Sequence, residues 1–266
     1  MNEPGRPVAL VTGASGGIGL ELARLCAKGG NDLVLVARNQ AKLEEIAKYL
    51  SGMYQIRVEV IPADLADAEA PAAIVEETSR RGLTIDVLVN NAGFGDWGLF
   101  GRADLDRQLA MIQVNVTSLT HLTRLLLPGM VHRRRGRILN VASTAAFAPG
   151  PLMAVYYATK AYVLSFSEAI GNELAGTGIT VTVLCPGPTR TGFADRAGLQ
   201  DSNLFGSPMV MDAAGVAEAG YRGMLHGKAI VIPGVLNKLL IQSIRISPRW
   251  AVRMVTRWFQ ERRQES

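Results

Sequence analysis

The chain has 266 residues, of which 48% are hydrophobic and 19% charged, and its formal net charge is +5. This length and composition predict one α/β domain that buries a full core and needs no accessory domain. The sequence contains no uncharged apolar run of about 18 residues, and the polar segment 1–7 lacks the apolar core of a signal peptide, which excludes a transmembrane helix and predicts a cytoplasmic protein.

Apolar strand-like runs alternate with amphipathic stretches, the pattern of a parallel sheet wrapped by helices on both faces. We predict strands at Val8–Thr12, Asp32–Ala37, Val58–Ala63, Val87–Asn90, Arg137–Ala142, Thr180–Leu184 and Ala229–Pro233. Two long helices are predicted at Asp104–Leu127 and Met153–Ala175. The predicted fold class is therefore α/β, a doubly wound Rossmann fold with a seven-stranded parallel sheet.

A glycine-rich turn joins the first predicted strand to the first helix. Four glycines, Gly13, Gly16, Gly17 and Gly19, fall within seven residues, which is more than a plain strand-to-helix turn needs. Glycine permits a tight turn, lets the backbone approach a pyrophosphate, and opens a helix whose N-terminal NH groups favour anions. The spacing differs from the usual G-x-G-x-x-G pattern, although the glycines would serve the same three purposes. The turn predicts a dinucleotide site.

Ser143, Tyr156 and Lys160 form a second pattern. Tyr156 and Lys160 lie one turn apart on a predicted helix, although such a pair alone is also typical of an exposed tyrosine beside a lysine. The ammonium group is expected to lower the pKa of the phenol from about 10 and make it a usable acid or base. Ser143 follows a strand, at the edge where open sheets bind ligands. Tyr157 competes for the acid role, and we predict that it is a packing residue.

The two patterns together resemble the short-chain dehydrogenase/reductase family, from about Val8 to Gly234. Four more motifs of the family occur in its order, namely Ala63-Asp64-Leu65, Asn90-Asn91-Ala92-Gly93, Asn115 and Pro186–Thr191. In the family, the acid touches the adenine ring and the second motif supports the central strand and the cofactor. The asparagine is catalytic, and the last segment meets the nicotinamide end.

The resemblance implies the residues of both sites. The implied catalytic residues are Asn115, Ser143, Tyr156 and Lys160. The implied cofactor site consists of Gly13, Ser15, Gly17, Ile18, Gly19, Arg38, Asp64, Leu65, Asn91, Ala92, Gly93, Tyr156, Lys160, Pro186, Gly187, Thr189 and Thr191.

The implied reaction is NADPH-dependent reduction of a carbonyl compound, with alcohol oxidation as its reverse. Tyr156 gives a proton to the carbonyl oxygen, and Ser143 steadies the developing charge with a hydrogen bond. Lys160 lowers the pKa of the tyrosine and holds the nicotinamide ribose, and Asn115 holds a water that connects Lys160 to solvent. The alternative is a non-catalytic dinucleotide-binding regulatory or scaffold protein. Family members that abandon chemistry commonly lose the tyrosine or the lysine, and this chain keeps both.

Cofactor preference is predicted from the end of the second strand. Folds that use NAD tend to place an acid there for the ribose 2′-OH, whereas a 2′-phosphate needs a cation. Ala37 occupies the position of that acid, and Arg38 follows it, which favours NADP over the alternative of a solvated strand end. Many NADP-preferring relatives also carry a basic residue where this chain has Gly16.

The substrate is predicted from the segment that covers the site in the family. The segment 188–211 contains Phe193, Leu199, Leu204, Phe205, Met209, Val210 and Met211. Such a lid suits an apolar ketone, aldehyde or acyl thioester, although a lid that merely closes the core would also be apolar. Phe94, Trp97 and Phe100 are candidates for an aromatic wall. In the family, the two long helices build a homodimer or homotetramer, although the same apolar faces would also cover a monomer's sheet.

We treat residues 1–234 as the Rossmann domain, including the lid, and residues 235–266 as its basic amphipathic extension. Residues 238–266 carry seven basic and two acidic side chains, and four arginines recur at every fourth position from Arg245 to Arg257, beside Trp250, Met254, Trp258 and Phe259. One interpretation is a basic helix on an anionic membrane surface. The other, which we favour, is a solvated helix whose aromatic side chains pack on the subunit or on its neighbour. No recognised nucleic-acid-binding motif accompanies the charge.

The cysteines and histidines indicate neither a disulfide framework nor a metal site. Cys26 and Cys185 lie in predicted apolar elements far apart in the chain and are predicted to be core residues. The three histidines, His121, His132 and His226, show no metal-ligand spacing. We expect no metal.

Overall fold

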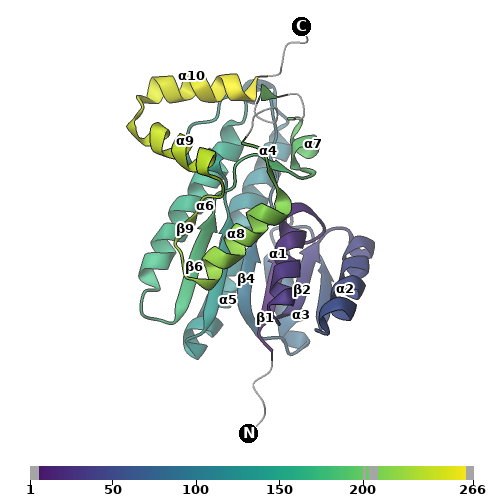
Figure 1. Cartoon of the computed structure of the whole chain (residues 1–266). Helices are drawn as coiled ribbons and strands as arrows, with labels where there is room; N and C mark the ends of the chain where they lie inside the picture. The colour runs from purple at the N-terminus through teal and green to yellow at the C-terminus, as the bar shows by residue number, and fades with distance from the viewer. Residues whose placement is uncertain (1–5, 200–201, 204–208, 262–266) are drawn as a thin grey trace.

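The computed structural model describes residues 6–199, 202–203 and 209–261 and contains one seven-stranded parallel sheet (Figure 1). Its strand order is β3-β2-β1-β4-β5-β6-β9, so the order reverses between β1 and β4. The strands are β1 (Val8–Thr12), β2 (Asp32–Ala37), β3 (Val58–Pro62), β4 (Ile85–Asn90), β5 (Gly136–Val141), β6 (Ile179–Leu184) and β9 (Ile230–Val231). The predicted doubly wound sheet is confirmed, and its last strand is shorter than predicted.

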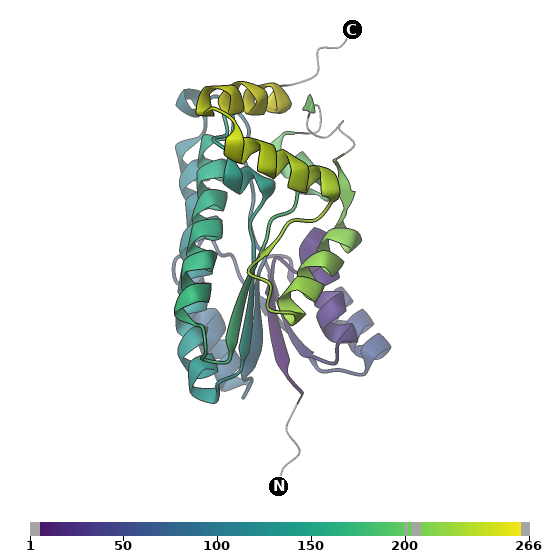
Figure 2. The same ribbon diagram turned by 60° about the vertical axis from the view of Figure 1, so that its left-hand side comes forward.

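Helices cover both faces of the sheet, which Figure 2 shows nearly edge-on. Because strand side chains alternate, Ala9 and Val11 pack toward one group of helices, and Val8 and Leu10 pack toward the other. The first group is α1 (Gly17–Lys28), α2 (Gln40–Tyr54) and α8 (Ala213–Leu225). The second group is α3 (Ala70–Arg80), α5 (Leu119–Arg133) and α6 (Ala154–Glu173).

The long helix predicted at Asp104–Leu127 is interrupted by a π-helical turn. It consists of α4 (Leu105–Ile112), the π turn (Gln113–Ser118) and α5, which continues to Arg133. Periodicity does not reveal such a turn, since it only shifts the apolar stripe by a fraction of a helical turn. The turn contains Asn115, which is buried.

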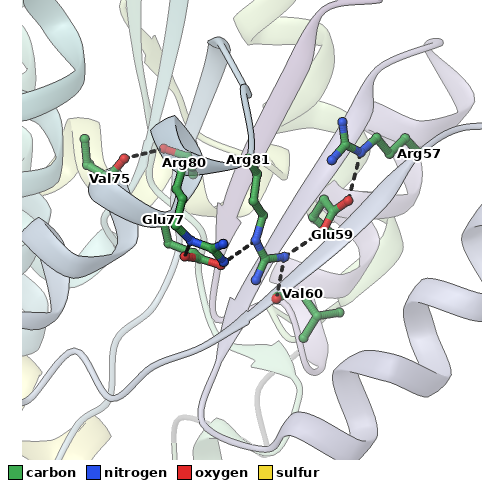
Figure 3. A network of polar contacts seen from close by, with 8 residues as sticks. Arg57, Glu59, Val60, Val75, Glu77, Arg80 and Arg81 are labelled. Atoms are coloured by element: carbon green, nitrogen blue, oxygen red, sulfur yellow. Dashed lines mark hydrogen bonds and ion pairs between the residues drawn. The ribbon is translucent and has the colours of Figure 1, made fainter.

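An ion-pair network fastens β3, at the edge of the sheet, to α3 (Figure 3). The Arg81 guanidinium donates from Nη1 to Glu59 Oε2 and from Nε to Glu77 Oε1, both at 2.6 Å. Arg57 binds the other Glu59 oxygen at 2.8 Å, and Arg80 binds Glu77. Hydrogen bonds from Arg80 and Arg81 lower the pKa of Glu77 to about 2. The network therefore joins the edge strand to the end of α3.

The C-terminal extension contains two helices, α9 (Val235–Ile246) and α10 (Arg249–Gln260). The prediction of a single basic helix is wrong because Pro248 has no NH group and favours an extended residue before it, and Ser247 has φ −85° and ψ 144°. Arg245 therefore lies on α9, and the other three regularly spaced arginines lie on α10. Both helices lie across the end of the molecule opposite the N-terminus (Figure 1).

None of the described helices has the length and apolar character that crossing a membrane requires.

Candidate active site

The glycine-rich turn has the backbone geometry that its sequence predicts. Gly13 and Gly17 have φ angles of +66° and +57°, which favour glycine. A Cβ atom on Gly19 would lie 2.4 Å from the Gly13 carbonyl oxygen and 2.3 Å from Asn91 Nδ2. Gly19 therefore lets α1 pack directly against the turn, and any side chain there would push the two apart.

Asn91 ties this turn to the end of β4. Its Nδ2 donates to the Thr12 carbonyl oxygen at 2.9 Å, and the backbone NH groups of Asn91 and Ala92 both donate to Thr12 Oγ1 at 3.0 Å. The predicted Asn-Asn-Ala-Gly motif thus joins the ends of β1 and β4, the two strands between which the strand order reverses.

The predicted adenosine end is open and positively charged. Arg38 is 73% exposed, and its Nη1 lies 4.0 Å from Asp64 Oδ2. Asp64 Oδ1 accepts from the Ala66 NH at 3.0 Å. Asn39 and Lys42, which sequence reasoning missed, line the same end of the cavity. Their position at the first turn of α2 follows from Asn39, which caps this helix by accepting from the Lys42 NH at 3.0 Å.

Ser143 and Tyr156 come together at the carboxyl end of β5. Ser143 Oγ accepts from the Ala145 NH at 3.1 Å and donates to the Pro186 carbonyl oxygen at 3.4 Å, a long hydrogen bond that the hydroxyl can exchange for one to a substrate oxygen. Tyr156 lies on the first turn of α6, beside the Ser143 hydroxyl, and its ring centre lies 5.3 Å from that of Phe193. The phenol and the serine can therefore contact one substrate oxygen.

Lys160 and Asn115 lie behind the phenol. Lys160 Nζ donates to the Val141 carbonyl oxygen at 2.9 Å and lies 5.8 Å from the centre of the Tyr156 ring. Asn115 bonds both backbone groups of Phe94, accepting from its NH at 3.1 Å and donating to its carbonyl oxygen at 3.0 Å. A Cβ atom on Gly93 would lie within 3.4 Å of both Asn115 Oδ1 and Lys160 Nζ, so these two polar groups are neighbours.

Burial dominates the acid-base properties of these groups. It raises the pKa of Tyr156 well above its ordinary value of 10, and the hydrogen bond with Ser143 opposes that rise only in part. Burial also lowers the pKa of Lys160 to about 8. The prediction that Lys160 lowers the pKa of the phenol is wrong, because the Lys160 ammonium does not contribute to the shift in the pKa of Tyr156. Burial of the phenolate costs more free energy than the hydrogen bond with Ser143 returns.

One cavity of about 1170 Å³ connects the glycine-rich turn, the Arg38 end and the Ser143–Tyr156 pair. Of the predicted cofactor and catalytic residues, all but two line this cavity. The exceptions are Gly19 and Asn115, which are buried behind its wall and support Gly13 and Phe94, respectively. The described residues contain no group of three or more His, Cys, Asp or Glu side chains that could hold a metal ion.

The predicted lid is partly described. It contains β7 (Thr189–Arg190), α7 (Phe193–Ala197) and β8 (Met211–Asp212), and β7 pairs with β8. Phe193, Leu199 and Met209 line the cavity. The predicted Leu204 and Phe205 lie outside the described residues. In the aromatic wall, Phe94 lines the cavity, whereas Phe100 is 67% exposed and does not.

Sequence reasoning missed the contribution of the C-terminal helices to the cavity. Leu240 and Ile244 of α9 and Val252, Val255 and Phe259 of α10 all line it. In α10 the residues without charge between the regularly spaced arginines indicated a buried face. The structure buries Val252, Thr256 and Gln260 there.

Gln260 fixes the end of α10 to the catalytic region. Its side-chain Nε2 donates to the Tyr157 hydroxyl at 2.6 Å, and its backbone carbonyl oxygen accepts from Trp97 Nε1 at 2.8 Å. Tyr157 is thus buried with its hydroxyl bound to Gln260, although it also lines the cavity, and its assignment as a packing residue stays a prediction. Trp250 and Trp258 are 61% and 57% exposed, so these tail aromatics do not pack on their own subunit, and the predicted packing on a neighbouring subunit stays a prediction.

Comparison with known families agrees with this geometry. A family model described as short chain dehydrogenase matches residues 7–201. The chain belongs to the short-chain dehydrogenase family. The predicted resemblance is confirmed, and this dehydrogenase is an oxidoreductase that acts on a small molecule.

Three relatives of this dehydrogenase cover most of its length. The ketoacyl reductase HetN of a Nostoc species is 32% identical over 257 residues, which are 94% of this chain and 88% of that one. A short-chain dehydrogenase from Sphingobium yanoikuyae in complex with NADPH is 33% identical with a TM-score of 0.80, over 91% of this chain and 97% of that one. The bulky-bulky ketone specific alcohol dehydrogenase from Comamonas testosteroni is 31% identical with a TM-score of 0.76, over 90% and 92%.

Proposed function

We propose that this dehydrogenase is an NADPH-dependent carbonyl reductase that also runs the reverse oxidation of an alcohol. The observation that carries the proposal is that Ser143, Tyr156 and Lys160 line the same cavity as the glycine-rich turn. A proton donor and a dinucleotide-binding turn in one cavity are the two parts that hydride chemistry on a carbonyl group requires.

The residues around the turn fit a nicotinamide dinucleotide. Gly16 is the N-cap residue of α1, and no side chain of the described residues caps the NH groups at this end of the helix. A Cβ atom built on Gly16 would meet nothing within 4 Å, so the space beside it is open. The first NH groups of α1 therefore suit the pyrophosphate. NADPH, when bound, supplies the hydride. Arg38 and Lys42 at the adenosine end suit a 2′-phosphate, which also agrees with the NADPH in the Sphingobium relative.

The buried phenol is suited to donate a proton. Because burial raises the pKa of Tyr156, the phenol stays protonated at neutral pH and is ready to protonate the carbonyl oxygen. Ser143 donates a hydrogen bond to the same oxygen as its negative charge develops. Lys160, with a pKa of about 8, is mostly an ammonium at neutral pH and stabilises the phenolate that remains. Asn115, beside Lys160, belongs to the route that returns a proton from solvent.

The substrate in this proposal is an apolar ketone, aldehyde or acyl thioester. The side chains that line the cavity beyond Tyr156 are mostly apolar, and they come from the lid and from both C-terminal helices. Two of the relatives are named a ketoacyl reductase and a bulky-bulky ketone specific alcohol dehydrogenase, and both names point to the same chemical class of substrate.

Homodimer or homotetramer formation through α4 to α6 is part of the proposal. Leu105 and Leu109 on α4 are 66% and 53% exposed, and Tyr162 on α6 is 39% exposed. Exposed apolar side chains on neighbouring helices are typical of a subunit interface.

The function is tested by following NADPH absorbance with ketones, aldehydes and acyl thioesters of graded chain length. We expect oxidation of NADPH with at least one of these classes and higher kcat/KM for longer apolar chains. If neither NADPH nor NADH is oxidised with any of them while both cofactors bind, the non-catalytic alternative replaces the proposal.

A further inference from the structure

The outer surface of α9 and α10 is apolar and exposed. We call it the cap surface, and its apolar residues, which are between 57% and 87% exposed, are Val235, Leu239, Ile246, Trp250, Met254 and Trp258. Exposed apolar side chains grouped on neighbouring helices are typical of interaction sites. None of these six residues lines the cavity, so the cap surface is separate from the proposed active site.

Side chains on α10 are sorted into three rows along the helix. Val252, Thr256 and Gln260 are buried and hold the helix on the protein. Trp250, Met254 and Trp258 recur at every fourth position and point outward. The arginine row, which is Arg249, Arg253 and Arg257, runs beside them and is exposed as well. The helix therefore presents aromatic side chains flanked by cations.

The charge of the cap surface selects its partner. Lys238, Arg245, Arg249 and Arg253 form no ion pair with any other described residue, and Arg257 pairs only with Glu261, at 3.0 Å. A second copy that met this surface face to face would bring like charges together. Its complement is a surface that accepts apolar side chains and carries negative charge, and an anionic lipid bilayer has both properties.

We propose that the cap surface docks on the surface of an anionic membrane. Trp250, Met254 and Trp258 insert at the level of the lipid headgroups, and the arginine row binds the lipid phosphates. Because the inner faces of α9 and α10 line the cavity, docking brings the wall of the cavity to the lipid surface.

The test is co-sedimentation of the full chain with vesicles of phosphatidylcholine, with and without phosphatidylglycerol, at low and high salt. We expect binding to the anionic vesicles at low salt and weaker binding at high salt, since salt screens the charge attraction. Brominated lipids in the anionic vesicles should quench tryptophan fluorescence, because Trp250 and Trp258 would lie among the lipids.

Two pairs of substitutions separate the charge of the cap surface from the net charge of the protein. Arg249→Gln with Arg253→Gln removes two cations of the cap surface and should weaken binding to anionic vesicles roughly thirty-fold at low salt. Lys28→Gln with Lys48→Gln removes the same net charge from exposed positions on α1 and α2 and should leave binding within about two-fold. Trp250→Ser should reduce both binding and quenching.

Retained circular dichroism spectra would show that these surface variants fold. The proposal is overturned if the protein stays in the supernatant with anionic vesicles at low salt. It is also overturned if the lysine pair weakens binding as much as the arginine pair, or if brominated lipids leave the fluorescence unchanged. A concentration-dependent change in tryptophan emission without lipid, combined with no sedimentation, would assign the cap surface to a second copy of the chain instead.

Discussion

Tyr156 and Lys160 are both buried, at 8% and 5% exposed, and no carboxylate accompanies them among the causes of their pKa shifts. Their spacing in the sequence predicts that they meet, because four residues make one helical turn. It does not predict their protonation, because desolvation depends on the cavity wall that α6, β5 and the lid build around them. Because its pKa is raised, the phenol is protonated at neutral pH, as the proposed proton donor must be.

The burial of Lys160 has a measurable effect on stability. Its pKa is about 8 in the folded protein against an ordinary 10.5, so the unfolded chain binds more protons between these values and folding is favoured as pH rises through them. We predict that wild type gains about 1–2 kcal/mol relative to Lys160→Met between pH 7 and pH 9.5. Urea unfolding of both proteins without cofactor at the two pH values measures this. A stability difference that stays constant with pH would contradict it.

Arg38 is expected to set the cofactor preference. A charge-assisted bond to the 2′-phosphate contributes about 1.5–3 kcal/mol, which corresponds to roughly a ten- to hundred-fold preference for NADPH over NADH in kcat/KM. Arg38→Ala should remove most of that preference by raising KM for NADPH. Arg24→Ala, on the exposed side of α1, is the matched control and should change neither the preference for NADPH nor the KM for NADPH. Equal use of both cofactors by the wild type would overturn the assignment.

At the scale of elements, the strands and most helices could be predicted from alternating apolar runs. The π turn around Asn115 could not, because it changes the apolar period too little. The break at Pro248 could have been predicted from the proline alone, and the regular spacing of the arginines concealed it. The role of α10 as a cavity wall depends on the contacts of Gln260 with Tyr157 and Trp97, which join residues far apart in the chain.

Substitution of Gln260 tests that wall. Gln260→Ala removes the donor to the Tyr157 hydroxyl and leaves a buried hydroxyl group without this partner, so the end of α10 should loosen. A lost buried hydrogen bond costs about 1–3 kcal/mol, and we expect KM for the longest apolar substrates to rise roughly five- to hundred-fold. Gln242→Ala, at an exposed position of α9 outside the cavity, is the control. A uniform loss for substrates of every chain length would point to general destabilisation instead.

At the scale of the whole molecule, the sheet brings three distant motifs to one edge. The glycine-rich turn follows β1, the Asn91 motif follows β4, and Ser143 follows β5, which are neighbours in the sheet order. This convergence could be predicted because parallel strands all end on the same side. The position of the C-terminal helices over that edge could not, since a chain that leaves β9 can pack on either side of it.

The most direct test of the proposed function is single-site removal of the Tyr156 hydroxyl. Tyr156→Phe keeps the ring against Phe193 and deletes only the proton donor. With the best carbonyl substrate from the NADPH screen, we predict that kcat falls by ~10²–10⁴-fold, while the Kd for NADPH, measured by fluorescence titration, changes less than about three-fold. A variant that binds NADPH normally and retains more than about a tenth of the wild-type rate would contradict the assignment of Tyr156 as the proton donor.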